Sequence, residues 1–170
     1  MAISGGECTL NRLWLLQYVR ELKRLNPDPN ARIHIDTNGS ILTKDYIDEL
    51  VEAGMTDIDP DLKGYYPETF MRITAIEDKG LVERYLNTAW DAVRYLIDKY
   101  KDRVFIGIGI PYNKELLSAQ QINPNFFFAL SKTWSTLYIK QNQWEIKFWP
   151  IDNAQVIFAN PLFLLRFYES

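Results

Sequence analysis

The segment Ala2-Ile3-Ser4-Gly5-Gly6-Glu7-Cys8-Thr9-Leu10 opens the chain with a short apolar stretch, two glycines, an acidic residue and the start of an amphipathic helix. This order predicts a strand, a tight turn and a helix. Paired glycines allow positive φ and let a ligand approach the backbone. The N-terminus of the next helix provides N–H groups and a positive dipole end. A Gly-Gly turn more often only connects two elements, but here it is a candidate site for a small polar ligand, and Glu7 suggests a ligand with an ammonium group.

Strand and helix patterns alternate along the chain as far as residue 118. Apolar residues at helical spacing predict helices from residue 15 to the turn at 26–30, over 43–53 and over 78–100. Runs of β-branched residues predict strands over 32–37, 56–59 and 104–110, the last closed by Pro111. This alternation predicts an α/β fold with a parallel sheet. Pro60 is unusual, because proline is poorly tolerated inside a central strand.

The composition narrows the classes of function. A length of 170 residues predicts one folded core, and the net charge of -3 argues against nucleic acid as a partner. The single cysteine, Cys8, excludes an internal disulfide and a thiolate metal cage built from this sequence alone. The sequence has no secretory leader pattern and no apolar run of roughly 18 residues, so we expect a cytoplasmic protein without a membrane span. The only histidine, His34, falls within a predicted strand and is given no role.

Polar residues gather where three predicted strands end, and ligands of parallel α/β folds bind at these ends. The three segments are Ser4-Gly5-Gly6-Glu7, Asp36-Thr37-Asn38-Gly39 and Asp59-Pro60-Asp61-Leu62-Lys63. In this order and at these intervals they resemble the radical S-adenosylmethionine enzymes, in particular the glycyl-radical activating enzymes typified by the pyruvate formate-lyase activase. The resemblance covers residues 2–118. It implies a partial (βα) half-barrel with a mainly parallel sheet, in which this sequence begins within the family's second strand.

The resemblance also implies roles for individual residues. Gly5, Gly6 and Glu7 would hold the methionine amino group of S-adenosylmethionine through carboxylate and carbonyl acceptors. Lys63 would face the methionine carboxylate as a point charge, and Asn38 would add a polar contact. Oxygen atoms suit a hard cation, and by the same resemblance the candidate ligands of a cation near the cofactor are Asp36, Thr37, Asp59 and Asp61.

One feature of the family is missing from this sequence. The family's [4Fe-4S] cluster is held by three thiolates of a Cys-x3-Cys-x2-Cys loop, and electron transfer from it cleaves S-adenosylmethionine to a 5'-deoxyadenosyl radical that abstracts hydrogen. Cys8 lies outside such a loop and is one thiolate instead of three. We therefore expect a truncated, activating-enzyme-like chain that is catalytically incomplete by itself. The alternative is a non-catalytic remnant or interaction module. The expected partners are a glycyl-radical-type enzyme or a chain that supplies the cluster strand.

A third class, a barrel-type aldolase or isomerase with Lys63 as a Schiff base, is less well supported. Such a lysine needs a lowered pKa, whereas the nearby Asp59 and Asp61 favour its charged form.

The last part of the sequence, residues 119–170, differs in composition from residues 1–118. All eight glycines lie before residue 110, and half of the 24 aromatic residues fall within the last 52 residues, whereas only 7 of 41 charged residues do. We interpret residues 1–118 as a radical S-adenosylmethionine core and 119–170 as a divergent aromatic-rich tail. A shifted reading frame or a gene rearrangement is one hypothesis for its origin.

Overall fold

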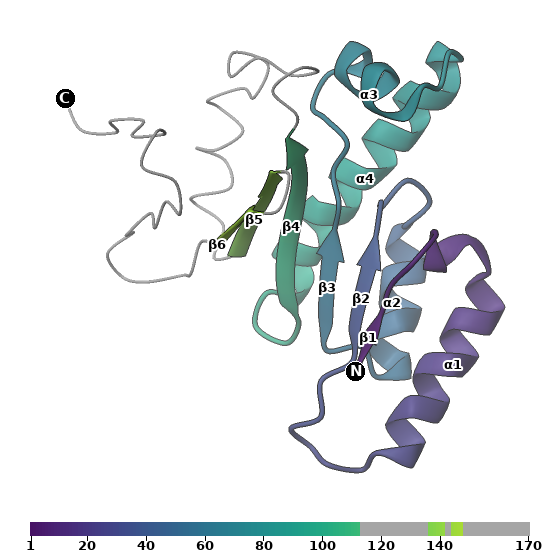
Figure 1. Ribbon diagram of the computed structural model, residues 1–170. Coiled ribbons are helices and arrows are strands. Elements are labelled where there is room, and N and C mark those ends of the chain that lie inside the picture. The colour runs from purple at the N-terminus through teal and green to yellow at the C-terminus, as the bar shows by residue number, and fades with distance from the viewer. Residues whose placement is uncertain (113–135, 142–143, 148–170) are drawn as a thin grey trace.

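The strands and helices that the sequence predicts occur in the predicted order (Figure 1), and unpredicted elements lie at residues 8–10, 67–74, 136–141 and 144–147. The structure is a computed structural model that describes residues 1–112, 136–141 and 144–147. The predicted boundary at residues 118 and 119 lies outside the described residues. The elements are β1 (Ala2–Ile3), the short 3-10 helix η1 (Cys8–Leu10), α1 (Arg12–Leu25), β2 (His34–Thr37), α2 (Lys44–Ala53), β3 (Asp57–Pro60), α3 (Pro67–Thr74), α4 (Lys79–Tyr100), β4 (Phe105–Tyr112), β5 (Thr136–Gln141) and β6 (Trp144–Lys147).

The strands form one sheet in the order β1-β2-β3-β4-β5-β6. Neighbouring strands from β1 to β5 are parallel, and β6 is antiparallel to β5. Crossovers between adjacent parallel strands are right-handed, so consecutive crossovers in one direction place their helices on the same side of the sheet. In agreement, α2 contacts both α1 and α4. The predicted α/β fold, a partial (βα) half-barrel with a mainly parallel sheet, is confirmed.

The core lies between the sheet and this layer of helices. Ile35 of β2, Ile58 of β3 and Leu15 of α1 are fully buried. Along β2 the buried residues Ile35 and Thr37 alternate with the half-buried His34 and Asp36. Because successive side chains of a strand point to opposite faces, β2 presents Ile35 and Thr37 to the helices and carries His34 and Asp36 on the other face.

Polar contacts fix the helices to each other. The Asp48 carboxylate of α2 accepts hydrogen bonds from the hydroxyls of Tyr95 and Tyr100 and from Lys99, all on α4. At the start of α4, Asp78 caps the helix by accepting from the N–H of Leu81. These contacts keep α2 and α4 in a fixed relation behind the strands.

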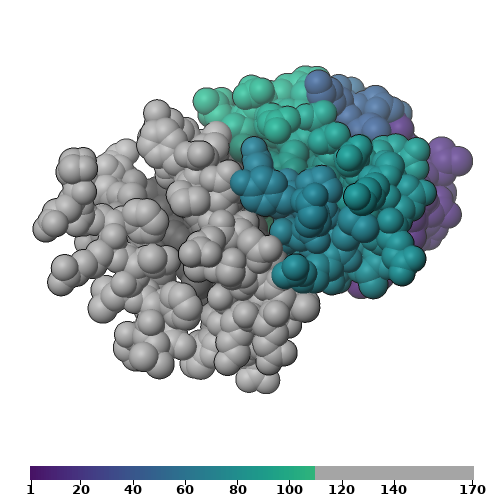
Figure 2. All heavy atoms as spheres, turned by 90° about the horizontal axis from the view of Figure 1, so that it is seen from above, coloured from purple at the N-terminus to yellow at the C-terminus, as the bar shows by residue number. Residues whose placement is uncertain are grey.

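Two differences from the sequence-based expectation concern α3 and Pro111. The eight-residue helix α3 was not predicted, although Pro67 begins its first turn. It lies near the end of the sheet where the parallel strands finish. Figure 2 views the molecule from that end, with α1 at the edge of the molecule. The expectation that Pro111 closes the fourth strand is wrong, because β4 continues to Tyr112 in register with β5. The φ of proline suits extended backbone, so Pro111 removes only one donor. Trp14 is 51% exposed and stacks on Tyr18.

Pro60 is the last residue of β3 and pairs with Thr37 of β2. The next N–H groups alternate in direction, since Asp61 donates to Thr37 of β2 and Leu62 donates to Gly109 of β4. The missing N–H of Pro60 therefore falls on the β4 side. Pairing between β3 and β4 stops after Ile58 and resumes at Asp61 in the same register. The strand accommodates its proline by leaving a gap in one ladder.

Candidate functional site

The turn that follows β1 has the geometry that its two glycines predict. Gly5 has φ +103° and Gly6 has φ +58°, backbone angles that residues other than glycine rarely adopt. A Cβ atom added to either residue would have no heavy atom of the described residues within 4 Å, apart from those of its neighbours in the chain. The backbone of this turn is therefore accessible to a ligand.

The carboxylate of Glu7 links this turn to the end of β2. One oxygen, Oε1, accepts from the N–H of Thr9 at 3.1 Å, from the hydroxyl of Thr37 at 2.6 Å and from the hydroxyl of Thr9. The other, Oε2, accepts from the N–H of Asn38 at 2.7 Å. Hydrogen bonds to a charged acceptor are stronger than neutral ones. Glu7 therefore holds the turn after β1 against the loop after β2.

Thr37 and Asn38 support the same junction. Thr37 is only 4% exposed, and its hydroxyl also accepts from the N–H of Gly39 at 3.1 Å. The side-chain oxygen of Asn38 accepts from the N–H of Ser40 at 2.9 Å. The Thr37 hydroxyl thus lies with Glu7 on the helix side of β2, whereas the Asp36 carboxylate lies on the opposite face. The structure does not bring these two candidate cation ligands together.

Cys8 lies half-buried beside the turn, and its Sγ donates to the backbone carbonyl of Asp36 at 3.1 Å. Burial, followed by the nearby Glu7 charge, raises the pKa of the Cys8 thiol from 9.0 to about 11. The thiol is therefore neutral at physiological pH, whereas metal ligation requires the thiolate. One protonated thiol does not fit a cluster that takes three thiolates.

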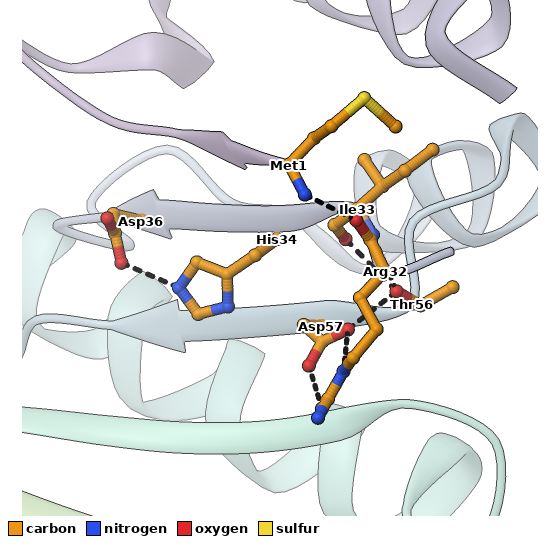
Figure 3. Close-up of polar contacts among 7 residues, drawn as sticks. All are labelled: Met1, Arg32, Ile33, His34, Asp36, Thr56 and Asp57. Carbon is orange, nitrogen blue, oxygen red and sulfur yellow. Dashed lines mark hydrogen bonds and ion pairs between the residues drawn. The ribbon is translucent and has the colours of Figure 1, made fainter. Parts of the chain in front are cut away.

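Three potential metal ligands meet on the face of the sheet away from the helices. The Nε2 atom of His34 lies 2.8 Å from Oδ1 of Asp36, as Figure 3 shows. His34, Asp36 and Asp59 each offer a ligand atom, and these atoms lie within 4.8 Å of one another. His34 was given no role from the sequence. The only signal was its spacing of two residues from Asp36, which puts both on one face of a strand.

The acidic residues of β3 and its following loop have separate partners. Asp57, 4% exposed, pairs with the guanidinium of Arg32 through both carboxylate oxygens (Figure 3). Asp61 pairs with Lys63 at 2.7 Å. A Cβ added to Gly109 of β4 would lie only 2.1 Å from Oδ1 of Asp61, so this glycine makes room for the carboxylate. Of these acidic residues only Asp59 joins the group around His34.

Lys63 is held at the carboxyl end of β3 by its neighbours. Leu62 is 2% exposed and donates its N–H to the carbonyl of Gly109 at 2.7 Å. On the other side, the indole N–H of Trp90 donates to the carbonyl of Gly64 at 3.1 Å. Trp90 thus joins α4 to the loop that follows β3. The ammonium of Lys63 stays partly accessible, with 25% of the side chain exposed.

An exposed glycine turn and charged side chains thus lie at the carboxyl ends of the parallel strands of this α/β partial half-barrel. The chain belongs to the Radical SAM superfamily, whose family model matches residues 1–117. Typical members of this family use S-adenosylmethionine and a [4Fe-4S] cluster. No curated protein matches the chain. Within the described residues, no helix is both long and apolar enough to cross a membrane.

The junction between Glu7 and Thr37 can be tested by removing one hydroxyl. We expect Thr37→Val to lower the free energy of unfolding by about 1–3 kcal/mol, because a partly buried carboxylate loses a donor. Thr37→Ser should retain most of the stability. Thr88→Val, on the exposed side of α4, is the control and should change stability by about 0.5 kcal/mol or less. Urea denaturation followed by circular dichroism measures all three. Equal effects of Thr37→Val and Thr88→Val would contradict the role of this junction.

The raised pKa of Cys8 predicts a pH dependence of reactivity. In the folded chain the thiol should react slowly with Ellman's reagent at pH 8 and gain thiolate absorbance only as the pH approaches about 11. The unfolded chain should gain it near the ordinary value of 9.0. Between these values the unfolded state binds fewer protons, so stability should fall as the pH rises. A folded-state titration at or below pH 9 would contradict this prediction.

Proposed function

We propose that this chain is a radical S-adenosylmethionine protein of the activating-enzyme type that binds the methionine end of S-adenosylmethionine. The observation that carries the proposal is the open turn at Gly5 and Gly6, held against the end of β2 by Glu7. This arrangement supports a binding role because the backbone is preorganised and accessible before the ligand arrives.

The contacts of Glu7 suggest how an ammonium group would be recognised. Both carboxylate oxygens already accept hydrogen bonds from Thr9, Thr37 or Asn38. Oε2 accepts only one of these bonds, from Asn38, so we assign the direct ammonium contacts to Oε2 together with the backbone carbonyls of Gly5 and Gly6. Glu7 contributes the orientation of the turn and a favourable negative charge.

Lys63 and Asn38 complete the proposed contacts. The Lys63 ammonium would exchange its bond with Asp61 for the methionine carboxylate, which keeps the cation paired throughout. Asn38 already uses its side-chain oxygen to accept from Ser40, so its amide N–H groups are the donors that it would offer to a ligand.

We further propose that the chain is catalytically incomplete by itself. The sequence contains one cysteine, and the Cys8 thiol is protonated and donates to the backbone of β2. The three thiolates that hold the cluster would then come from a partner chain, and the radical would act on a partner such as a glycyl-radical-type enzyme. The second candidate, a non-catalytic remnant or interaction module, rests on the same cysteine count. Residues 1–118 are the unit to which both proposals apply.

Binding of S-adenosylmethionine can be measured by isothermal titration calorimetry with the full chain. We expect saturable binding that Lys63→Met weakens about tenfold, equal to about 1.4 kcal/mol. Lys101→Met, at an exposed position after α4, is the matched control and should leave the affinity unchanged. 5'-Methylthioadenosine lacks the amino acid portion, so its binding should not respond to Lys63→Met. The proposal fails if S-adenosylmethionine does not bind or if both lysine variants bind it equally.

The proposed incompleteness has its own test. After anaerobic reconstitution with iron and sulfide, the purified chain should contain no stoichiometric cluster and give no low-temperature electron paramagnetic resonance signal on reduction. A stoichiometric cluster whose signal changes on addition of S-adenosylmethionine would overturn this part of the proposal and would leave the binding site intact.

A further inference from the structure

We propose that His34, Asp36 and Asp59 form a site for one divalent transition-metal ion on the face of the sheet away from the helices. Their ligand atoms lie within 4.8 Å of one another. The inference does not depend on the binding of S-adenosylmethionine. It shares Asp36 and Asp59 with the oxygen-only cation site that the family resemblance implies, but it has His34 in place of Thr37 and Asp61 and selects a different ion.

The backbone places the three ligands together. His34 and Asp36 are two residues apart on β2 and therefore share a face. Asp59 of β3 is the residue directly paired with Asp36 in the parallel ladder. Adjacent strands lie about 4.8 Å apart, so the three side chains start from neighbouring points on two rigid strands. Binding an ion would need small side-chain adjustments rather than a rearrangement of loops.

The chemistry of the three ligands favours a transition metal. An imidazole nitrogen suits zinc, copper, iron or nickel, whereas magnesium and calcium prefer oxygen ligands only. Two carboxylates balance the charge of a divalent ion. The side chains of His34 and Asp36 are 28% and 36% exposed, which leaves access for the ion and for water as a further ligand.

The other oxygen ligands expected from the sequence have different contacts. The Thr37 hydroxyl bonds to Glu7 on the helix side of β2. Asp61 pairs with Lys63 and packs against Gly109. The four oxygen ligands expected from the sequence, Asp36, Thr37, Asp59 and Asp61, therefore do not lie together. Asp36 and Asp59 lie beside His34, whereas Thr37 and Asp61 have other contacts.

A nearby carboxylate has a different partner and does not compete for the ion. Asp57 pairs with His34 in the backbone register, but its carboxylate is bound by the guanidinium of Arg32 and by the hydroxyl of Thr56. Figure 3 shows this pair beside the bond between His34 and Asp36. Arg32 thus neutralises the carboxylate of Asp57, whereas the carboxylates of Asp36 and Asp59 lie beside His34 and can bind a metal ion.

The single histidine of the chain makes the test direct. We would titrate Zn²⁺ into the full chain without other ligands, following the one imidazole by nuclear magnetic resonance and the heat by calorimetry. The expected result is one ion per chain with a change in the imidazole signals, and no such change with Mg²⁺ at the same concentration. Co²⁺ should give visible absorption bands on binding to the same site.

Variants of similar size test the ligands. His34→Gln and Asp59→Asn should each weaken Zn²⁺ binding at least tenfold while retaining the circular dichroism spectrum of the metal-free chain. Asp98→Asn, at an exposed position on α4, is the matched control and should bind normally. Unchanged imidazole signals, or equal Zn²⁺ affinity in His34→Gln and the parent chain, would overturn the proposal. Equal competition by Mg²⁺ would overturn it in favour of an oxygen-only site.

Discussion

Two hydrogen bonds to the carboxylate of Glu7, from the hydroxyl of Thr37 and the N–H of Asn38, join the turn after the first strand to the end of the second, and two more from Thr9 hold the carboxylate within its own turn. The first strand pairs through only Ala2 and Ile3, so its ladder alone gives it little hold on the sheet. A partly buried charge is stable only when donors surround it. The Glu7 side chain therefore links the Gly-Gly turn, the hydroxyl of Thr37 and the loop that begins at Asn38. These contacts hold the backbone of Gly5 and Gly6 in position.

The alternation of side chains along β2 divides the remaining chemistry between two faces of the sheet. The face toward the helices carries Thr37, whose hydroxyl serves the Glu7 junction and the local backbone. The opposite face carries His34 and Asp36, next to Asp59 on the neighbouring strand. One segment of four residues thus contributes both to the Glu7 junction and to the proposed metal site. A one-residue slip of the strand would exchange these faces and abolish both.

The elements that follow from local periodicity were predicted well from the sequence. The long helix α4 and the strand β2 are examples, because their apolar spacing reflects one buried face. The partner of each charged group was not predictable. Asp57, Asp59 and Asp61 look alike in the sequence, but because of strand register and loop shape Asp57 pairs with Arg32, Asp61 pairs with Lys63 and Asp59 lies within 4.8 Å of His34. The role of His34 was missed for the same reason, since a two-residue spacing from Asp36 is ordinary strand alternation until Asp59 is placed beside it.

The interruption at Pro60 has a consequence for how the sheet fluctuates. Backbone pairing of β3 with β2 covers four successive residues, whereas pairing with β4 is broken between Ile58 and Asp61. Local opening follows the weakest set of hydrogen bonds, so amide hydrogens along this seam exchange with solvent before those between β2 and β3. The pairing of β2 with β3 is therefore the more continuous of the two ladders of β3. The strands that carry His34, Asp36 and Asp59 are thus joined by four successive residue pairs that do not depend on β4.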